Sequence, residues 1–531
     1  MIAATTPRRG VRQGLGALAG LGALYAALAA PAAQAHTVGQ APTASTSGGS
    51  IVIVNPVGTP DCLDPQKTAL GSSFYVFSSV VDPLFSTDES GHIRPDLATS
   101  YTYGVGGTTL TVSLRHGVRF SNGDPFDASA VKYTFDRALN PATKSPATAA
   151  SLAALKSTQV VNPYTVRLVL KTPYRPLLTQ LAIAYEGILD PKAPPTCQAP
   201  IGTGPFKIQS VGPGFSSVTV VRNPYHTFET PWARNRGPAY LDKIVFNSIV
   251  SNATSVSDLL SGGADISTIL GTQLNRVHGN AGIAQHKIPT QGEDYLGYNT
   301  AHTPFNQVAV RRAVAQAIDR KAVVTGAFSG LATPAYSPIP TTLPFYDKAA
   351  PGYAPQYDIA AAQKALAGTN AAHGRYTLLV PSEQPLPQAA ELIQAELGQV
   401  GINVSIVTKP LGDFIPLAAK GQYDLLLLGW GYPDPDFLYQ LLDSSQGAGA
   451  GLNFTNYKSA TLDSLIVKGR TATDNGQAAT AYAQLQRFVD TNVIIDPLVT
   501  PAAIYGVRTR VKGWHTSSDT SILYQDLYVA S

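Results

Sequence analysis

The second half of the chain alternates between two hydrophobic patterns, one typical of strands and one typical of amphipathic helices. Short apolar runs are separated by stretches in which apolar residues recur at every third or fourth position. This pattern predicts strands at 376–380, 402–408 and 423–430, with helices at 387–401 and 413–422 between them. Strands that alternate with helices form parallel sheets through right-handed crossovers. The four leucines at 425–428 place apolar side chains on both faces of the strand, which indicates a strand buried within such a sheet.

A single continuous helix is expected over 309–327, just before this alternating region. Its apolar face would hold four residues: Val310, Val314, Ala317 and Ile318. A second helix is expected over 359–367, because Asp358 can cap its first turn and Gly368 can end it.

The first half predicts a smaller unit of strands with a helix packed on them. Strands are expected at 50–57 and 108–120, on both sides of Asn162-Pro163, and on both sides of Gly212-Pro213-Gly214. Asp127 is placed to cap a helix over 128–139, which should stop before Asn140-Pro141.

The stretch GWGYPDPDFLY, Gly429–Tyr439, directly follows the buried strand. In open α/β sheets, ligands bind in the crevice outside the carboxyl ends of the strands, so this position predicts a ligand-binding role. The alternative is that its glycines and prolines only turn the chain and that Trp430 is core. For an isolated motif the turn is the better interpretation, because such residues are more often structural.

The N-terminus has the three parts of an export signal. Three arginines, Arg8, Arg9 and Arg12, precede an apolar stretch over 15–30, and Ala33-Gln34-Ala35 is a small-x-small cleavage site. Residues 1–35 are therefore predicted to be a signal peptide, followed by a flexible N-terminus at 36–45. The alternatives are a permanent membrane anchor and, for the route, twin-arginine rather than Sec export.

The composition agrees with an exported globular protein. Apolar residues make up 44% of the 531 and charged residues only 14%. Removing the leader removes three arginines and no acid, which reduces the net charge from +4 to +1. This near neutrality argues against a nucleic-acid partner, which needs a basic surface. We expect a periplasmic or extracellular cell-surface protein with no lipid anchor, because no cysteine stands at the cleavage site.

The two cysteines, Cys62 and Cys197, both belong to the exported part of the chain, where disulfides persist. A structural disulfide between them is predicted. The alternative is a metal or nucleophile pair, but no CxxC spacing supports it.

No catalytic or cofactor motif is present. The sequence lacks HExxH and a phosphate-binding GxxxxGK[ST], the mature part lacks GxSxG, and the nine histidines are scattered. Asp434, Asp436 or Glu293 could serve as acid or base, so a secreted hydrolase stays open as an alternative. No catalytic residue, metal site or cofactor is predicted.

Several stretches, taken in order, resemble one family. The segment LRHGVRFSNGDPFDASAVKYTFDRAL, Leu114–Leu139, is similar to a signature of the extracellular solute-binding proteins, family 5, of peptide/nickel-type ABC importers. Here Ala130-Val131 replaces the frequent Asp-Val of that family. Further matching stretches lie at 62–65, 80–85, 95–101, 201–206, 221–226, 259–266, 296–300 and 310–320. The resemblance covers the mature chain and includes the oligopeptide- and dipeptide-binding proteins.

The resemblance implies a two-lobed α/β fold of the periplasmic-binding-protein type (type II), with an extra α+β subdomain on the first lobe. Lobe I would comprise 46–72, 198–290 and 501–531, the subdomain 73–197, and lobe II 291–500. The implied function is that of a monomeric substrate-binding component, which captures a peptide or peptide-like solute in the inter-lobe cleft and delivers it to a membrane permease. Closure around the solute would be a population shift.

The resemblance also implies a binding site. In peptide-binding members the glycines of the Gly-Trp segment pair their backbone with an extended peptide, as an added strand would. The expected ligand-binding residues here are Gly429, Trp430, Gly431, Tyr432, Asp434, Asp436, Tyr298, Asn299 and Thr59.

One expected acid is missing from this site. Peptide-binding members usually carry an aspartate directly before the tyrosine, where it pairs with the ammonium of the ligand. Here Gly431 precedes Tyr432, and no acid stands between Trp430 and Tyr432. Either Asp434 or Asp436 takes this role, or the solute has no free α-amine, which is the reading we favour.

Three alternatives follow for the function. The solute could be an opine, an oligosaccharide or a metal chelate. The chain could be a secreted hydrolase on the same scaffold. It could also be a chemosensory or surface-attachment module with this fold.

Overall fold

A long mixed sheet organises the computed structural model, which describes residues 47–530 except 56, 57, 229, 231, 250, 448 and 450. Its strands follow the order β16-β15-β17-β13-β18-β11-β1-β10-β9-β8, and β12 and β14 also pair with β18. The predicted signal peptide at 1–35 and the flexible segment at 36–45 lie outside the described residues. The described residues belong to one compact unit.

One end of this sheet is built around the first strand of the chain. The strand β1, Ser50–Asn55, pairs in parallel with β10, Lys243–Ser248, and with β11, Ile266–Thr268. Beyond β10 lie the antiparallel strands β9, Ser217–Arg222, and β8, Phe206–Val211, on either side of the predicted Gly-Pro-Gly turn. Buried apolar side chains from these strands form a core, among them Ile51, Ile53, Phe206, Val220 and Ile244.

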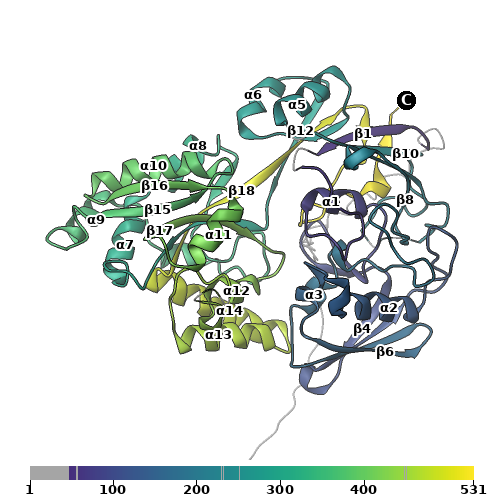
Figure 1. The fold of residues 1–531 in the computed structure, drawn as a ribbon, viewed down its shortest axis with the longest axis horizontal. Helices are drawn as coiled ribbons and strands as arrows, with labels where there is room; N and C mark the ends of the chain where they lie inside the picture. The colour runs from purple at the N-terminus through teal and green to yellow at the C-terminus, as the bar shows by residue number, and fades with distance from the viewer. Residues whose placement is uncertain are drawn as a thin grey trace, which may run out of the picture. The chain divides into compact units, whose positions relative to one another are not determined.

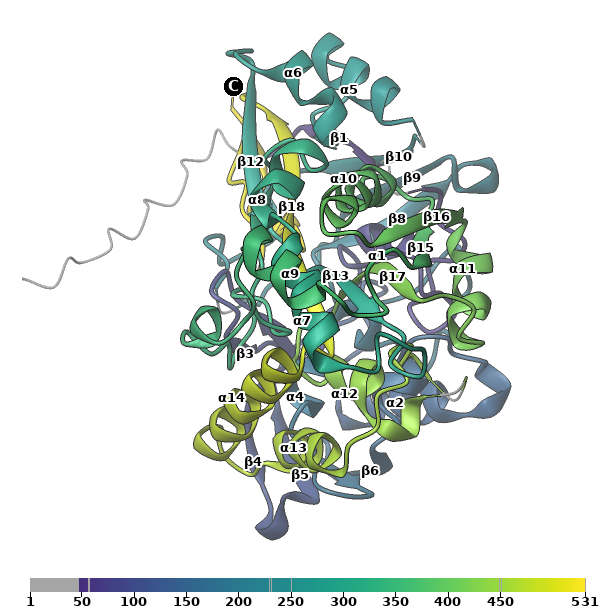
Figure 2. The same ribbon diagram turned by 90° about the vertical axis from the view of Figure 1, so that its left-hand side faces the viewer.

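The other end holds the predicted alternation of strands and helices. The strand β15, Arg375–Pro381, pairs in parallel with β16, Asn403–Lys409, and with β17, Leu425–Gly431, which confirms the predicted parallel sheet. The helix α10, Leu386–Gln399, lies beside β15 and β16 in both views (Figure 1, Figure 2). The next helix is α11, Leu411–Ala419.

Two antiparallel strands complete this region. The strand β13, Gly292–Tyr298, pairs with β17 along its whole length. The long strand β18, Ile495–Arg508, pairs through its first part with β13 and through its last part with β11 and with β12, Ile283–Pro289. Its middle pairs with β14, Ala332–Pro334. The predicted crossings near 290 and 500 therefore fall between β12 and β13 and within β18, while the lobe boundaries themselves stay a prediction.

A second, four-stranded antiparallel sheet lies in the first half of the chain. Its order is β4, Ala98–Tyr103, β5, Thr109–Leu114, β7, Thr165–Leu170, and β6, Leu155–Asn162. The β6–β7 hairpin turns at Asn162-Pro163, as predicted. The helix α2, Ala128–Leu139, has the predicted cap, because the Asp127 carboxylate accepts from the Ser129 N–H at 2.8 Å.

The expectation of one continuous helix over 309–327 is wrong. The structure has two helices, α7, Val308–Ala317, and α8, Arg320–Gly326. The chain is extended at Ile318, with φ −99° and ψ 118°, and Asp319 caps α8 by accepting from the Lys321 N–H at 2.9 Å. The break between the two helices leaves Arg320 buried in the protein interior, where its guanidinium donates to the Asp496 carboxylate at 2.5 Å. The predicted apolar face is nevertheless buried, and α9, Ile359–Leu366, has its predicted Asp358 cap.

The remaining elements are short or peripheral to the large sheet. They are α1 Gly71–Phe77, β2 Phe85–Thr87, β3 Ile93–Pro95, α3 Thr148–Ser151, α4 Leu177–Gln180, α5 Asn252–Ser261, α6 Leu274–Val277, α12 Phe437–Leu442, α13 Ala460–Thr471, α14 Asn475–Asn492, β19 Val511–Lys512 and β20 Tyr528–Val529.

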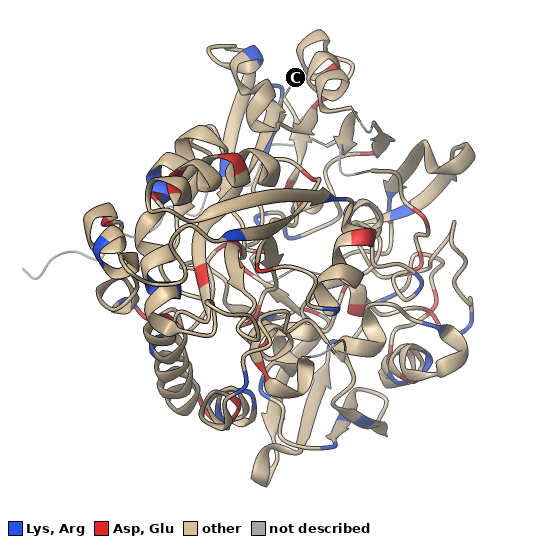
Figure 3. Ribbon diagram, turned by 60° about the vertical axis from the view of Figure 1, so that its left-hand side comes forward, with Lys and Arg blue, Asp and Glu red and all other residues tan. Residues whose placement is uncertain are grey.

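A disulfide joins Cys62 to Cys197, which are 135 residues apart. It ties the segment after β1 to the segment before β8, and the Leu63 N–H donates to the Cys197 carbonyl at 2.8 Å beside it. Basic and acidic residues are scattered along the ribbon, with both kinds in many of the elements (Figure 3). Within the described ranges, the helices all fall short of the length and hydropathy that a membrane span requires.

Candidate functional site

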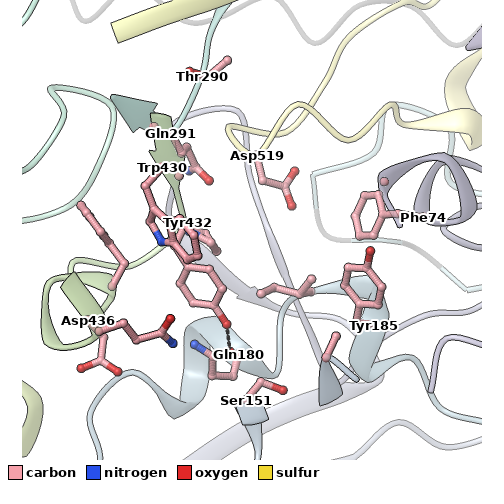
Figure 4. Close-up of a pocket in the computed structure, with 18 of the residues that line it drawn as sticks. Phe74, Ser151, Gln180, Tyr185, Thr290, Gln291, Trp430, Tyr432, Asp436 and Asp519 are labelled. Atoms are coloured by element: carbon pink, nitrogen blue, oxygen red, sulfur yellow. Dashed lines mark hydrogen bonds between the residues drawn. The ribbon is translucent and has the colours of Figure 1, made fainter. Parts of the chain in front are cut away.

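A cavity of about 730 Å³ lies where segments far apart in the sequence meet. Phe74 from α1 and Tyr185, just after α4, line one side of it, and Trp430 and Tyr432 line another (Figure 4). The first residues of β13 and the segment around Asp519 also line it. Its volume is within the range of about 300–1,000 Å³ that is usual for small-molecule sites.

The strand β17 reaches this cavity with one open edge. All seven of its residues pair with β13 on one side. On the other side, β15 pairs only with Leu425 and Leu426. Among the described strands, none pairs with 427–431 along that second edge.

The pairing register decides which backbone groups face this open edge. The Tyr432 N–H donates to the Gln291 carbonyl at 3.4 Å, which makes the pair before it, Gly431 and Gly292, a non-hydrogen-bonded pair. A β-carbon on Gly431 would lie 3.0 Å from the Gly292 α-carbon, as this close type of pair requires. Because the pattern repeats every second residue, the N–H and C=O groups of Gly431 and Gly429 point away from β13. They are available to a ligand.

This geometry changes the boundary expected from the sequence. The strand was expected over 423–430, and β17 runs one residue further, to Gly431. Gly429, Trp430 and Gly431 are therefore strand residues, and the turn begins at Tyr432. An unpaired strand edge and a chain turn are thus both present in the stretch, in that order.

The two aromatic residues of the stretch border the cavity. The Tyr432 hydroxyl donates to the side-chain carbonyl of Gln180 (Figure 4), and burial raises the pKa of Tyr432. The indole Nε1 of Trp430 is buried and has no hydrogen-bond partner in the described part of the chain. Trp430 also packs partly against the core beneath β17.

Asp434 and Asp436 have partners within the protein. The Asp434 carboxylate is 1% exposed and accepts from the Thr179 hydroxyl at 3.0 Å and from the Asp436 N–H at 2.9 Å. Burial, together with the charge of Asp436, raises the pKa of Asp434 to about 6. Asp436 accepts from the Tyr174 hydroxyl at 2.8 Å and forms an ion pair with Arg470 at 2.6 Å. These contacts join the stretch to residues 174–180.

The sequence-predicted site residues do not all meet at the cavity. Those that line it are Gly429, Trp430, Gly431, Tyr432 and Asp436, whereas Asp434 lies outside it. Tyr298 is fully buried and its hydroxyl donates to the Arg311 carbonyl at 3.3 Å. Asn299 donates to the Tyr423 carbonyl at 3.0 Å, and the exposed Thr59 offers its carbonyl to Ser72. None of these last three lines the cavity.

Besides Asp436, the structure places four acids at the cavity that were not among the expected ligand-binding residues. Five carboxyl groups line the cavity, and none of its described lining residues is Lys, Arg or His; the five are Glu186, Glu293, Asp294, Asp436 and Asp519. Burial raises the pKa of Glu186 to about 8 and that of Asp294 to about 7. It also raises the pKa of Glu293, with a further contribution from Asp490. No local motif marks the four added acids, because strand register and loop packing bring them together.

Groups of three or more His, Cys, Asp and Glu side chains placed to hold a metal ion do not occur within the described ranges. The lining residues make the cavity an acidic, partly aromatic pocket beside the open edge of β17.

A family model named "Bacterial extracellular solute-binding proteins, family 5 Middle" matches residues 92–450. The chain belongs to this family. The family resemblance inferred from the motifs is confirmed. Members of this family bind solutes and work with ABC permease subunits.

Among curated relatives, the glutathione-binding protein GsiB of Escherichia coli (strain K12) is 27% identical over 485 residues, which cover 88% of this chain and 91% of GsiB. Among solved structures, DppA from Helicobacter pylori in complex with the peptide STSA has a TM-score of 0.74 at 24% identity, covering 92% of this chain and 99% of that one. The substrate-binding protein CtaP from Listeria monocytogenes has a TM-score of 0.79 at 20% identity, covering 91% and 100%. These likenesses confirm the predicted periplasmic-binding-protein fold.

Proposed function

We propose that this substrate-binding protein captures a peptide-like solute in the cavity by pairing it with the open edge of β17. The observation that carries the proposal is the backbone of Gly429 and Gly431, whose N–H and C=O groups face the cavity edge without a strand neighbour among the described residues. An open strand edge offers alternating donors and acceptors at a fixed spacing, and an extended peptide presents the complementary set.

The two glycines suit this role for a steric reason. A ligand strand lies about 5 Å from the strand that it pairs with, and glycine leaves that approach free. Main-chain pairing supplies affinity with little side-chain selectivity. The relatives named for glutathione and the complex with the peptide STSA are consistent with a peptide-like solute.

The cavity also supplies a reason for closure. Its lining comes from segments assigned by prediction to lobe I, to the subdomain and to lobe II. A solute that contacts all of them binds the closed arrangement more tightly than an open one, and this shifts the population towards closure. In the proposed cycle the exported monomer, with no lipid anchor, then delivers the unchanged solute to the permease and performs no catalysis.

The test is to identify the solute that accompanies the protein. The freshly purified protein is denatured, and the released small molecules are identified by mass spectrometry. We expect an intact peptide or peptide-like molecule. Recovery of an opine, an oligosaccharide or a metal chelate would contradict the peptide assignment.

A second measurement uses defined compounds. Glutathione, Met-Leu and Ser-Thr-Ser-Ala are added to the ligand-free protein, and thermal unfolding is followed. Binding to the folded state should raise the unfolding temperature in a concentration-dependent way. The compounds are then recovered and analysed, because conversion to products would indicate an enzyme instead of a binding protein.

A further inference from the structure

Asp294 and Gly429 face each other across the β13–β17 pair. They belong to the same non-hydrogen-bonded series as Gly292 and Gly431, so their α-carbons approach closely and their side-chain positions share one face. The Asp294 Oδ1 occupies the space that a β-carbon on residue 429 would need. The carboxylate therefore lies against the glycine whose backbone faces the open edge.

This carboxylate has no hydrogen-bond or ion-pair partner among the residues that the structure describes. Asp294 is 9% exposed, lines the cavity, and receives neither a hydrogen bond nor an ion pair from any described residue. Buried carboxylates are normally hydrogen-bonded or paired with a cation, because an isolated buried charge is costly. A buried acid that lines a cavity without a protein partner points to a partner that arrives with the ligand.

Each of the other acids of the cavity has at least one polar partner. Asp436 pairs with Arg470, and Asp519 accepts from the Ser521 N–H at 3.0 Å and from the Ser517 hydroxyl. Glu186 accepts from Ser151 through Oε1, while its Oε2 is buried without a hydrogen-bond partner among the described residues. Glu293 is hydrogen-bonded to the Thr500 side chain.

We propose that Asp294 binds a protonated amine of the solute, directly beside the backbone-pairing position at Gly429. The inference rests on the proposed function and specifies it: the solute carries a cationic nitrogen close to the end of the segment that pairs with β17. Asp294 would do what an acid between Trp430 and Tyr432 could have done, but from the neighbouring strand. The absence of Lys, Arg and His from the described lining supports a cationic group over an anionic one.

The burial of Asp294 agrees with this assignment. Without a cation, burial raises the pKa of its carboxyl to about 7. An ammonium in contact with it would favour the ionised form and lower that pKa. The charge-assisted hydrogen bond so formed is among the stronger polar contacts in a water-poor site.

The experiment compares two probes that differ only in the charged nitrogen. Tri-L-alanine and N-acetyl-tri-L-alanine are titrated calorimetrically into the parent, into Asp294→Asn and into the control Asp413→Asn, which changes an exposed acid of α11 outside the cavity lining. We expect the parent to prefer the free amine by at least about tenfold. Asp294→Asn should remove that preference, whereas Asp413→Asn should retain it.

Each other outcome overturns the inference in a distinguishable way. Equal binding of both probes by the parent, or an unchanged preference in Asp294→Asn, contradicts the role of Asp294 and leaves the proposed function standing. Failure of both probes to bind the parent contradicts the proposed peptide function, and the inference falls with it. Thermal unfolding of each variant establishes that it is folded, and if Asp294→Asn does not fold, Asp294→Ser replaces it.

Discussion

The Asp294 carboxylate lies against the α-carbon of Gly429, in the space that any larger residue at 429 would occupy. The two positions are 135 residues apart in the chain, and only the antiparallel pairing of β13 with β17 brings them together. The acid and the open backbone edge thus form one site. Changes at either residue should therefore alter binding of the same part of the solute.

The substitution Gly429→Ala should disable this site while leaving the fold intact. The added methyl group would collide with the Asp294 Oδ1 and push the carboxylate away from its position. We expect the affinity for tri-L-alanine, measured by calorimetry, to fall by at least about tenfold. Gly412→Ala is the matched control, because a β-carbon there meets nothing within 4 Å. Unchanged affinity in Gly429→Ala would contradict the assigned edge.

Asp294→Asn should stabilise the ligand-free protein at high pH. Burial raises the pKa of Asp294 to about 7, above the unfolded value of about 3.9. Between these values the folded state holds a proton that the unfolded state has released, so the contribution of Asp294 to stability falls as pH rises from about 4 to 7. The difference in unfolding free energy between Asp294→Asn and the parent should shift in favour of the variant by about 1–4 kcal/mol between pH 4 and pH 8. Urea unfolding at both pH values measures it, and a pH-independent difference would argue against an unpartnered buried charge.

Binding of a free-amine peptide should strengthen as pH rises. Below about pH 7 the Asp294 carboxyl is protonated and cannot pair with an ammonium, so the affinity for tri-L-alanine should increase between pH 5.5 and pH 8. The increase should be absent for the N-acetylated peptide and in Asp294→Asn. If the affinity of Asp294→Asn for tri-L-alanine still increased with pH, the pH dependence would be assigned to Glu186 or Glu293, whose pKa values are also raised by burial.

Asp434→Asn should weaken the contact between the stretch and residues 174–180 without changing amine selectivity. The two carboxylate oxygens of Asp434 accept one hydrogen bond each, from the Thr179 hydroxyl and from the Asp436 N–H. Asparagine has an NH₂ group in place of one of these oxygens, so one of the two hydrogen bonds loses its acceptor. At pH 5, where the folded state keeps Asp434 protonated and no buried charge is removed, we expect a loss of about 1 kcal/mol in unfolding free energy. Any fall in affinity should be equal for the free and the acetylated tripeptide. A selective loss of free-amine binding would instead make Asp434 the ammonium anchor.

Removal of the disulfide should lower stability but leave selectivity intact. Cys62 and Cys197 close a loop of 135 residues, remote from the open edge of β17 in the sequence. Replacing both by serine should cost about 2–5 kcal/mol of unfolding free energy, measured by denaturant titration. Intact-mass analysis with and without reductant provides the control, because two free thiols in the parent would remove the basis of this prediction.

The elements that were predicted well depend on local chemistry. The cap of α2 needs only the Asp127 side chain and the nearby Ser129 N–H, and the parallel strands β15, β16 and β17 follow from apolar runs separated by helical periodicity. The division of 309–327 into two helices needed more than periodicity. The apolar face continues through the break, and the break itself depends on the burial of Arg320 against the distant Asp496.

The sequence by itself determined the family, the strand–helix alternation and the position of Gly429–Tyr439 at the end of a buried strand. Only the tertiary structure decided that β13 flanks β17, that the other edge of β17 is open at 427–431, and that an acid stands beside Gly429. The physical reason is register: side-chain periodicity and capping act over a few residues, whereas the pairing of strands far apart in the chain depends on the packing of the whole core. The acid missing from the motif was therefore to be found on a neighbouring strand.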